Sequence, residues 1–182
     1  MHSFGLSART TDDPGTHARN APSLYADPVA WLLCEVTGQA LAGCPDDVLH
    51  HTDEVGHLAV SDHGTLDTMR ALARSGRRGR VSPLRFAGAN PGSLAGLACL
   101  RWGLRGPTMM LAMPPSPAGP AAVAVAQRWL DTGQARHVVL ATHTVRDGVH
   151  EARCAVLARD AVAGTTPLDW ADVAGGAPVT VR

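Results

Sequence analysis

Residues 103–119, GLRGPTMMLAMPPSPAG, run through a turn, an apolar strand and a proline-rich stretch where a strand-to-helix elbow would present a nucleophile. Ser116 carries the hydroxyl at this point, and a nucleophilic serine needs a base within hydrogen-bond reach and donors for an oxyanion. Pro114, Pro115 and Pro117 surround it, and proline has no N–H to donate. The hydrolase pattern GxSxG is also absent, because the local sequence is PPSPA. We therefore expect Ser116 to be a surface turn residue.

Five histidines could ligate a metal or act as a base. His50, His51, His57 and His63 lie close together in the sequence, but no HExxH pattern or cysteine pair accompanies them, so we expect no metal site. His50 and His51 fit a solvated loop. His63 and His143 each end a predicted strand, at the edge where α/β sheets bind ligands, so either could face a ligand. The alternative is that His143 caps its strand end. Nothing in the sequence indicates a cofactor.

All basic residues of the chain are arginines, and 16 of them balance 16 acidic residues. This zero net charge favours neither nucleic acid nor an anionic membrane as a partner, and the absence of lysine excludes Schiff-base chemistry. The basic run consists of Arg70, Arg74, Arg77, Arg78, Arg80 and Arg85. No aromatic residue interrupts RSGRRGR, so stacking on single-stranded nucleic acid is poorly supported. A solvated helix end and a docking patch are the two remaining interpretations.

The composition indicates one domain with a core of small aliphatic side chains. The 182 residues are 45% hydrophobic and only 4% aromatic, which suits close packing of Ala, Val and Leu against a parallel sheet. The four cysteines form no CxxC pair, so we expect reduced thiols and a cytoplasmic protein. No apolar run reaches the roughly 18 residues of a membrane span. An arginine-rich, lysine-free composition is typical of high-GC bacterial coding.

Strand-length apolar runs alternate with helical patterns along the chain. Residues 1–23 are polar and aperiodic, so we predict a disordered N-terminal arm, followed by one domain over residues 24–182. The predicted strands are VAWLLCEVTG, HLAVSD, MMLAM, HVVLATH and ARCAVLA. The predicted helices cover residues 65–74, 93–102 and 120–132. The alternation predicts an α/β fold with a mostly parallel five-stranded sheet, in which the last two strands could pair antiparallel at one edge.

The GLRGP turn, the V-S-P segment upstream of it and the order of the predicted elements resemble the amino-terminal half of β-ketoacyl synthases. The resemblance covers residues 29–181 and implies a single thiolase-type half, with residues 169–173 belonging to the strands that close it. Pro115 and Ser116 stand where this family has its reactive cysteine. The family's two active-site histidines belong to a second half for which this chain has no room, so the resemblance implies a truncated protein without the catalytic constellation.

The resemblance implies a non-catalytic subunit of a bacterial type II polyketide or fatty-acid assembly. Such a subunit would pair with a second copy, a ketosynthase or a chain-length-factor partner. The interface strand would include Thr108, Met109, Met110, Leu111 and Met113. An acidic acyl carrier protein would dock on Arg74, Arg77, Arg78 and Arg80. The alternative function is a residual acyl-thioester decarboxylase or acyltransferase that uses Ser116 or His143.

Overall fold

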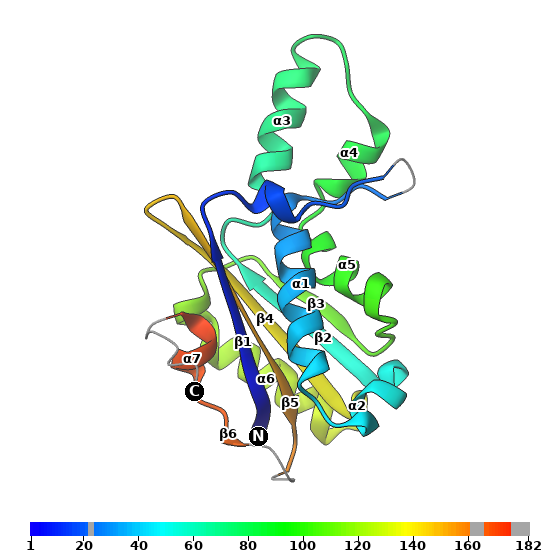
Figure 1. Cartoon of the computed structure of the whole chain (residues 1–182), viewed down its shortest axis with the longest axis vertical. Helices are drawn as coiled ribbons and strands as arrows, with labels where there is room; N and C mark the ends of the chain where they lie inside the picture. The colour runs from blue at the N-terminus through cyan, green and yellow to red at the C-terminus, as the bar shows by residue number, and fades with distance from the viewer. Residues whose placement is uncertain (22–23, 161–165, 176–182) are drawn as a thin grey trace.

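A computed structural model describes residues 1–21, 24–160 and 166–175, and shows a mixed sheet covered by helices on both faces (Figure 1). The sheet has six strands in the order β3-β2-β4-β5-β1-β6. The strands are β1 (His2–Thr11), β2 (Val55–Ser61), β3 (Thr108–Leu111), β4 (His137–Arg146), β5 (Val149–Ala158) and β6 (Thr166–Pro167). The α-helices are α1 (Pro28–Ala42), α2 (Asp46–His50), α3 (Leu66–Gly76), α4 (Pro83–Gly88), α5 (Ser93–Trp102), α6 (Pro115–Asp131) and α7 (Trp170–Ala174). Two short 3₁₀ helices are η1 (Pro14–His17) and η2 (Thr52–Glu54).

The predicted α/β class is confirmed, with a mixed sheet. β2 pairs in parallel with β3 and β4, while β4–β5, β5–β1 and β1–β6 are antiparallel. The expected antiparallel pair is β4–β5, joined by a tight turn at Asp147 and Gly148 with positive φ angles of 52° and 79°. This pair is not at an edge, because β1 and β6 extend the sheet beyond it. The sheet therefore has six strands where five were expected.

Residues 2–11, which were predicted to belong to a disordered N-terminal arm, form the first strand of the sheet. β1 pairs with β5 from His2 to Thr11, with a register shift between Phe4 and Leu6. Phe4 lies in the core, and the hydroxyl of Ser7 donates to the Val36 carbonyl of α1 at 2.7 Å. Phe4, Leu6 and Ala8 alternate with other residues, as in a strand, but their side chains are too few to give a continuous apolar run.

The run VAWLLCEVTG, predicted as the first strand, is a helix. The Asp27 side chain accepts from the Val29 N–H at 2.8 Å and Pro28 occupies the first helical position, so the local sequence carries a helix start. Residues 29–34 of α1 are all buried, because the helix packs against the sheet, α5 and η1. A helix that is apolar all round has no visible period, and this explains the error.

Two further boundaries differ from the prediction. α6 begins at Pro115, not at Pro120, so Pro120 lies in the second turn of the helix. Residues 169–173, expected to be strand, form most of α7, which starts where the Asp169 side chain accepts from the Ala171 N–H at 2.9 Å. The predicted C-terminal limit of the domain at residue 182 lies outside the described residues.

The helices form two layers and a projection. α1 and α5 cover one face of the sheet, α6 and α7 cover the other, and each layer closes its own hydrophobic cluster. α3, α4 and the loop between them project beyond the end of the sheet (Figure 1). Within the described parts of the chain, no helix is long and apolar enough to cross a membrane.

Candidate functional site

The loop between β3 and α6 places Ser116 at the surface, in the first turn of α6. Ser116 is exposed, and it lines a small cavity of about 170 Å³ together with Asp62, Pro114, Thr144 and Arg146. In the described part of the chain, its hydroxyl has no hydrogen-bond partner, and no histidine lines this cavity. Ser116 is thus exposed as expected, although in a helix rather than a turn, and Asp62 is the carboxylate that lines the same cavity.

The start of α6 is poor in hydrogen-bond donors. The first N–H groups of a helix are free to stabilise an anion, but Pro115 and Pro117 have none. Trp170 of α7 covers this turn: its indole N–H donates to the Pro115 carbonyl at 3.2 Å, and its ring lies against Gly119. A Cβ on Gly119 would lie 3.0 Å from the indole. The turn is thus a packed contact between two helices and lacks the parts of an oxyanion hole.

His143 instead belongs to a buried histidine cluster, which we define as His63, His143 and His150. The Nδ1 atom of His143 shares a hydrogen bond with the Ser61 hydroxyl at 3.0 Å, and its Nε2 atom shares one with Nδ1 of His150 at 3.0 Å. The ring of His63 lies 5.7 Å from that of His143, and Nε2 of His63 contacts Asp67 at 3.2 Å. Both ring nitrogens of His143 are therefore engaged.

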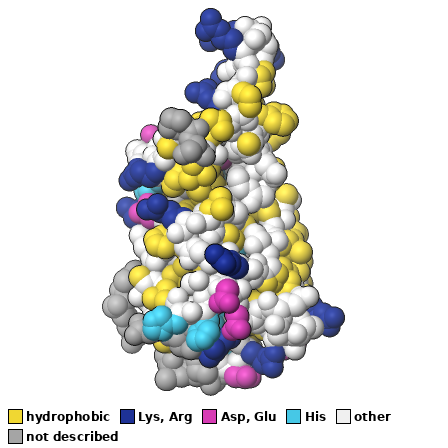
Figure 2. All heavy atoms as spheres, turned by 90° about the vertical axis from the view of Figure 1, so that its right-hand side faces the viewer, with side chains coloured by type: hydrophobic (Ala, Val, Ile, Leu, Met, Phe, Trp, Pro, Cys, Tyr) yellow, Lys and Arg dark blue, Asp and Glu magenta, His cyan; other side chains and the backbone are white. Residues whose placement is uncertain are grey.

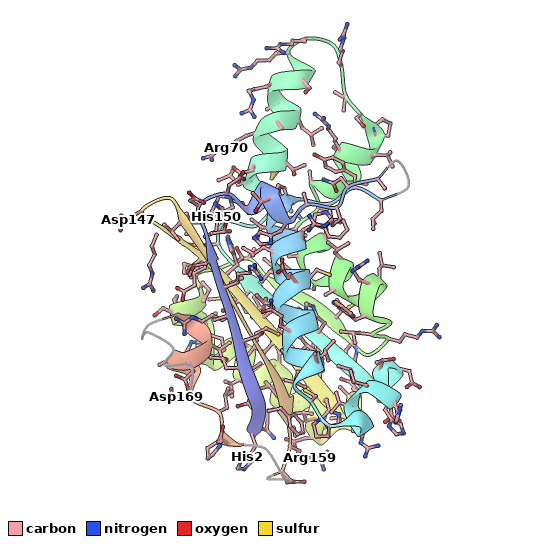
Figure 3. All side chains as sticks on the ribbon, in the orientation of Figure 1. His2, Arg70, Asp147, His150, Arg159 and Asp169 are labelled. Atoms are coloured by element: carbon pink, nitrogen blue, oxygen red, sulfur yellow. The ribbon has the colours of Figure 1, made fainter. Side chains whose placement is uncertain are left out.

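The histidine cluster occupies the upper end of β4 and β5, at the base of α3, where Figure 3 labels His150 below Arg70. Burial is the main cause that lowers the pKa of His143, to about 3, with further contributions from His150 and then His63. Ser61 and His143 are fully buried, so neither can reach a substrate without opening of the cluster. A Ser–His–His series could do nucleophilic chemistry, but in this structure its Ser61 and His143 are buried at the root of the projection.

The other histidines and cysteines are structural or peripheral. His57 is fully buried in β2, and burial lowers its pKa to about 4. His50 is exposed as expected, but it is the last residue of helix α2 and His51 is half-buried, so the two do not form the solvated loop that was predicted. The cysteines are free thiols, and burial raises the pKa of three of them to about 11 or 12: Cys34, Cys44 and Cys154. Within the described ranges, no group of His, Cys, Asp and Glu side chains could hold a metal ion.

β3 forms an open edge of the sheet. Among the described strands it pairs with β2 alone, and the His57 N–H donates to the Pro107 carbonyl at 2.9 Å. The parallel register then turns the amides of Thr108 and Met110 away from β2. Met109 is 38% exposed, Met110 and Leu111 are half-buried, and Met113 packs against the α6 layer. The strand therefore offers both unpaired backbone groups and apolar side chains.

The projection of α3 and α4 carries the predicted arginine patch. Arg74, Arg77, Arg78 and Arg80 are all exposed (Figure 2, dark blue at the top). No acidic residue occurs between Asp67 and Asp131, so this region is strongly basic although the whole chain is neutral. Apolar side chains lie beside the arginines, including Val81 and Phe86, which is 70% exposed. Basic and apolar groups thus share one exposed surface.

Sequence analysis alone gave no indication of the partners of His143. Ser61 and His150 come from β2 and β5, and the sheet register brings them to His143, while Asp67 of α3 contacts His63. His143 lies opposite Ser61 across the β2–β4 pair and opposite Ala152 across the β4–β5 pair. The sequence contains the histidines but no signal for this spatial arrangement.

The chain matches the family described as "Beta-ketoacyl synthase, N-terminal domain" over residues 8–160. It is a member of the β-ketoacyl synthase family. The match includes the GLRGP turn, β3 and the start of α6, where Pro115 and Ser116 occupy the elbow. The predicted family and thiolase-type fold are confirmed. A search of curated proteins finds no match.

Solved structures show the same fold at low sequence identity. A ketosynthase in complex with its chain length factor from Xenorhabdus doucetiae is 11% identical, with a TM-score of 0.65, and the match covers 87% of this chain and 79% of that one. A type II polyketide synthase acyl-carrier protein in complex with its ketosynthase gives 13% identity, a TM-score of 0.64 and coverages of 87% and 62%. An oxazolomycin ketosynthase domain of Streptomyces albus is 18% identical, with a TM-score of 0.54, and the match covers 85% of this chain and 46% of that one. In the last two, the chain spans less than two thirds of the matched chain.

Proposed function

We propose that this family member is a non-catalytic ketosynthase-like subunit of a bacterial type II polyketide or fatty-acid assembly that acts in the cytoplasm through protein contacts. The observation that carries the proposal is the elbow: Pro115 and Pro117 offer no N–H donor, and the Ser116 hydroxyl makes no hydrogen bond to a base within the described residues. An open sheet edge at β3 accompanies this loss. An element that cannot do acyl transfer but keeps an unpaired strand is suited to binding a protein.

The partner we propose is a ketosynthase, a chain length factor or a second copy of this chain. Two structural relatives are described as ketosynthases with a chain length factor, which supports a partner of this class. The contact surface would be Thr108, Met109, Met110, Leu111 and Met113. Methionine side chains adapt to an apolar partner surface, while the outward amides supply backbone pairing.

The arginines of the projection form the proposed second contact, with an acidic acyl carrier protein. One relative is described as an acyl-carrier protein in complex with its ketosynthase. Arg77 and Arg78 lie beyond the end of α3 and have no acidic neighbour in the described residues, so their charges remain available to a partner. The exposed Phe86 would add apolar contact to this electrostatic attraction.

The experiment that tests the proposed function is incubation of the purified protein with malonyl-carrier protein, together with co-purification of a cognate ketosynthase–chain length factor pair. We expect retention of the pair and no release of CO2 above the protein-free background. CO2 release at a rate proportional to protein concentration would instead establish the alternative, a residual decarboxylase. Failure to retain the pair, combined with a monomeric mass, would exclude the subunit role.

A further inference from the structure

The outer surface of the α1–α5 layer contains a groove of about 400 Å³ that the proposed subunit role does not use. We call it the indole groove. The residues that matter here are Arg19, Trp31, Glu35, Gly38, Arg101 and Trp102. It lies on helices α1 and α5, and none of the residues that line it belongs to β3 or to the tip of the projection. Its volume falls in the range of small-molecule sites in proteins.

Gly38 determines the shape of the groove. A Cβ at this position would lie 2.3 Å from Cζ2 of Trp102, so only glycine lets the indole lie across α1. The Trp102 N–H donates to the Cys34 carbonyl at 3.1 Å, and the Trp31 N–H donates to Oδ1 of Asn20 at 3.0 Å. Because both indole donors are already bonded, the rings are held in place, and Trp102 keeps 38% of its surface exposed to a ligand.

The charges around the indole groove favour an anion. Both carboxylate oxygens of Glu35 are occupied, one by Arg9 and the other by His17. Arg101 lies over the Trp102 ring at 5.7 Å from its centroid, and neither it nor Arg19 has an acidic partner in the described ranges. The groove therefore combines an aromatic wall with two cations that no carboxylate neutralises.

The groove is a binding site without a nucleophile. Cys34 lies on its floor, but burial raises the pKa of this thiol to about 11, so it stays protonated at neutral pH. A protonated thiol behaves as a small apolar surface. A flat apolar ligand would therefore lie on the exposed part of Trp102, because Cys34 is almost fully buried, with its charged group toward the arginines.

We propose that the indole groove binds a small planar aromatic carboxylate. The ring system stacks on Trp102, and the carboxylate pairs with Arg101 at the rim. This site shares no lining residue with the proposed β3 interface or with the carrier-protein patch, so it can be tested whether or not those contacts exist.

The test is titration of the full-length protein with 2-naphthoate, followed by calorimetry, with 2-naphthamide as the uncharged control. We expect saturable binding of the carboxylate, weaker binding of the amide, and a roughly tenfold loss of affinity in Arg101→Gln, since a hydrogen bond to a charged group is lost. Arg101 is exposed, so this variant leaves the fold intact. Trp102→Leu should abolish the binding.

Two matched variants complete the design. Arg128→Gln removes an exposed arginine from α6, and Leu100→Gln changes an exposed residue of α5 that does not line the groove. Both should bind 2-naphthoate like the unchanged protein. The absence of saturable binding up to about 10 mM, a threshold weaker than a 1 mM site, would overturn the proposal. Equal affinity in Arg101→Gln and Arg128→Gln would also overturn it.

Discussion

Ser116 and His143 are the two residues whose types suggest acyl-transfer chemistry, and the surroundings of neither favour it. Ser116 is exposed and makes no hydrogen bond to a base within the described residues, while His143 has both ring nitrogens bonded inside the sheet. A serine nucleophile depends on a base within hydrogen-bond reach, so the two residues cannot act together.

Replacement of Ser116 by alanine should have no measurable effect. The hydroxyl makes no hydrogen bond within the described structure, so the free energy of unfolding should change by less than about 0.5 kcal/mol, as at an ordinary surface site. Urea denaturation measures this change, and CO2 release from malonyl-carrier protein should stay at background in both proteins. A loss of any activity in Ser116→Ala would show that the elbow still does chemistry.

His57 should make stability depend on pH. Its folded pKa of about 4 lies below the usual 6.5, so between these values the unfolded chain binds a proton that the folded chain does not. The free energy of unfolding is therefore not reduced by His57 above pH 6.5. It decreases as the pH drops from 6.5 toward 4, by about 1.4 kcal/mol per pH unit.

Urea denaturation of the native protein and of His57→Gln between pH 5 and 6.5 isolates this contribution. Glutamine keeps a polar group near the Thr37 hydroxyl, which lies 3.4 Å from Nε2 of His57, but does not titrate. The slope of the unfolding free energy against pH should be smaller in the variant, by close to the amount that uptake of one proton on unfolding produces. Identical slopes would show that His57 titrates normally.

At the scale of elements, the sequence predicted α3, α5 and the β4–β5 pair well but missed β1 and α1. α5 was predicted over the residues that it occupies. Its apolar residues have helical spacing, and Gly103, which follows the helix, marks its C-terminal end. α1 was misassigned because burial on all sides erases the helical period, although Asp27 and Pro28 mark its start. The histidine cluster could not be predicted, since it depends on strand register.

α3 also shows that an apolar face need not be a core face. Leu66, Met69, Leu72 and Ala73 have helical spacing, yet Met69 is 52% exposed because α3 projects beyond the sheet. Exposed apolar side chains next to unpaired arginines are typical of a surface that binds another protein.

The double substitution Arg77→Ala/Arg78→Ala should weaken binding of the cognate acyl carrier protein by about tenfold at low salt, since each exposed ion pair contributes up to about 1 kcal/mol. The difference should shrink at 0.5 M NaCl, where surface charges are screened. Calorimetric titration measures the affinity. Arg105→Ala/Arg128→Ala serves as the matched control, because both residues are exposed outside the projection. Unchanged affinity in the first variant would exclude the patch.

At the scale of the whole molecule, the chain has no net charge, but its charges are unevenly distributed. In the described residues, both edge strands of the sheet, β3 and β6, are short. β3 has four residues and β6 has two, and β3 carries the apolar methionines. The proposed subunit role therefore depends on which protein pairs with β3. Met109→Asp places a charge in the proposed interface, where Met109 is 38% exposed, and Leu100→Asp places one on an apolar site of α5 that is more exposed, at 75%.

The most direct measurement is size-exclusion chromatography with light scattering of the native protein, Met109→Asp and Leu100→Asp, each alone and with a cognate ketosynthase–chain length factor pair. We expect a species heavier than the 18.9 kDa monomer for the native protein and for Leu100→Asp, alone or with the pair, and its loss in Met109→Asp. A native protein that remains at 18.9 kDa under both conditions would contradict the account.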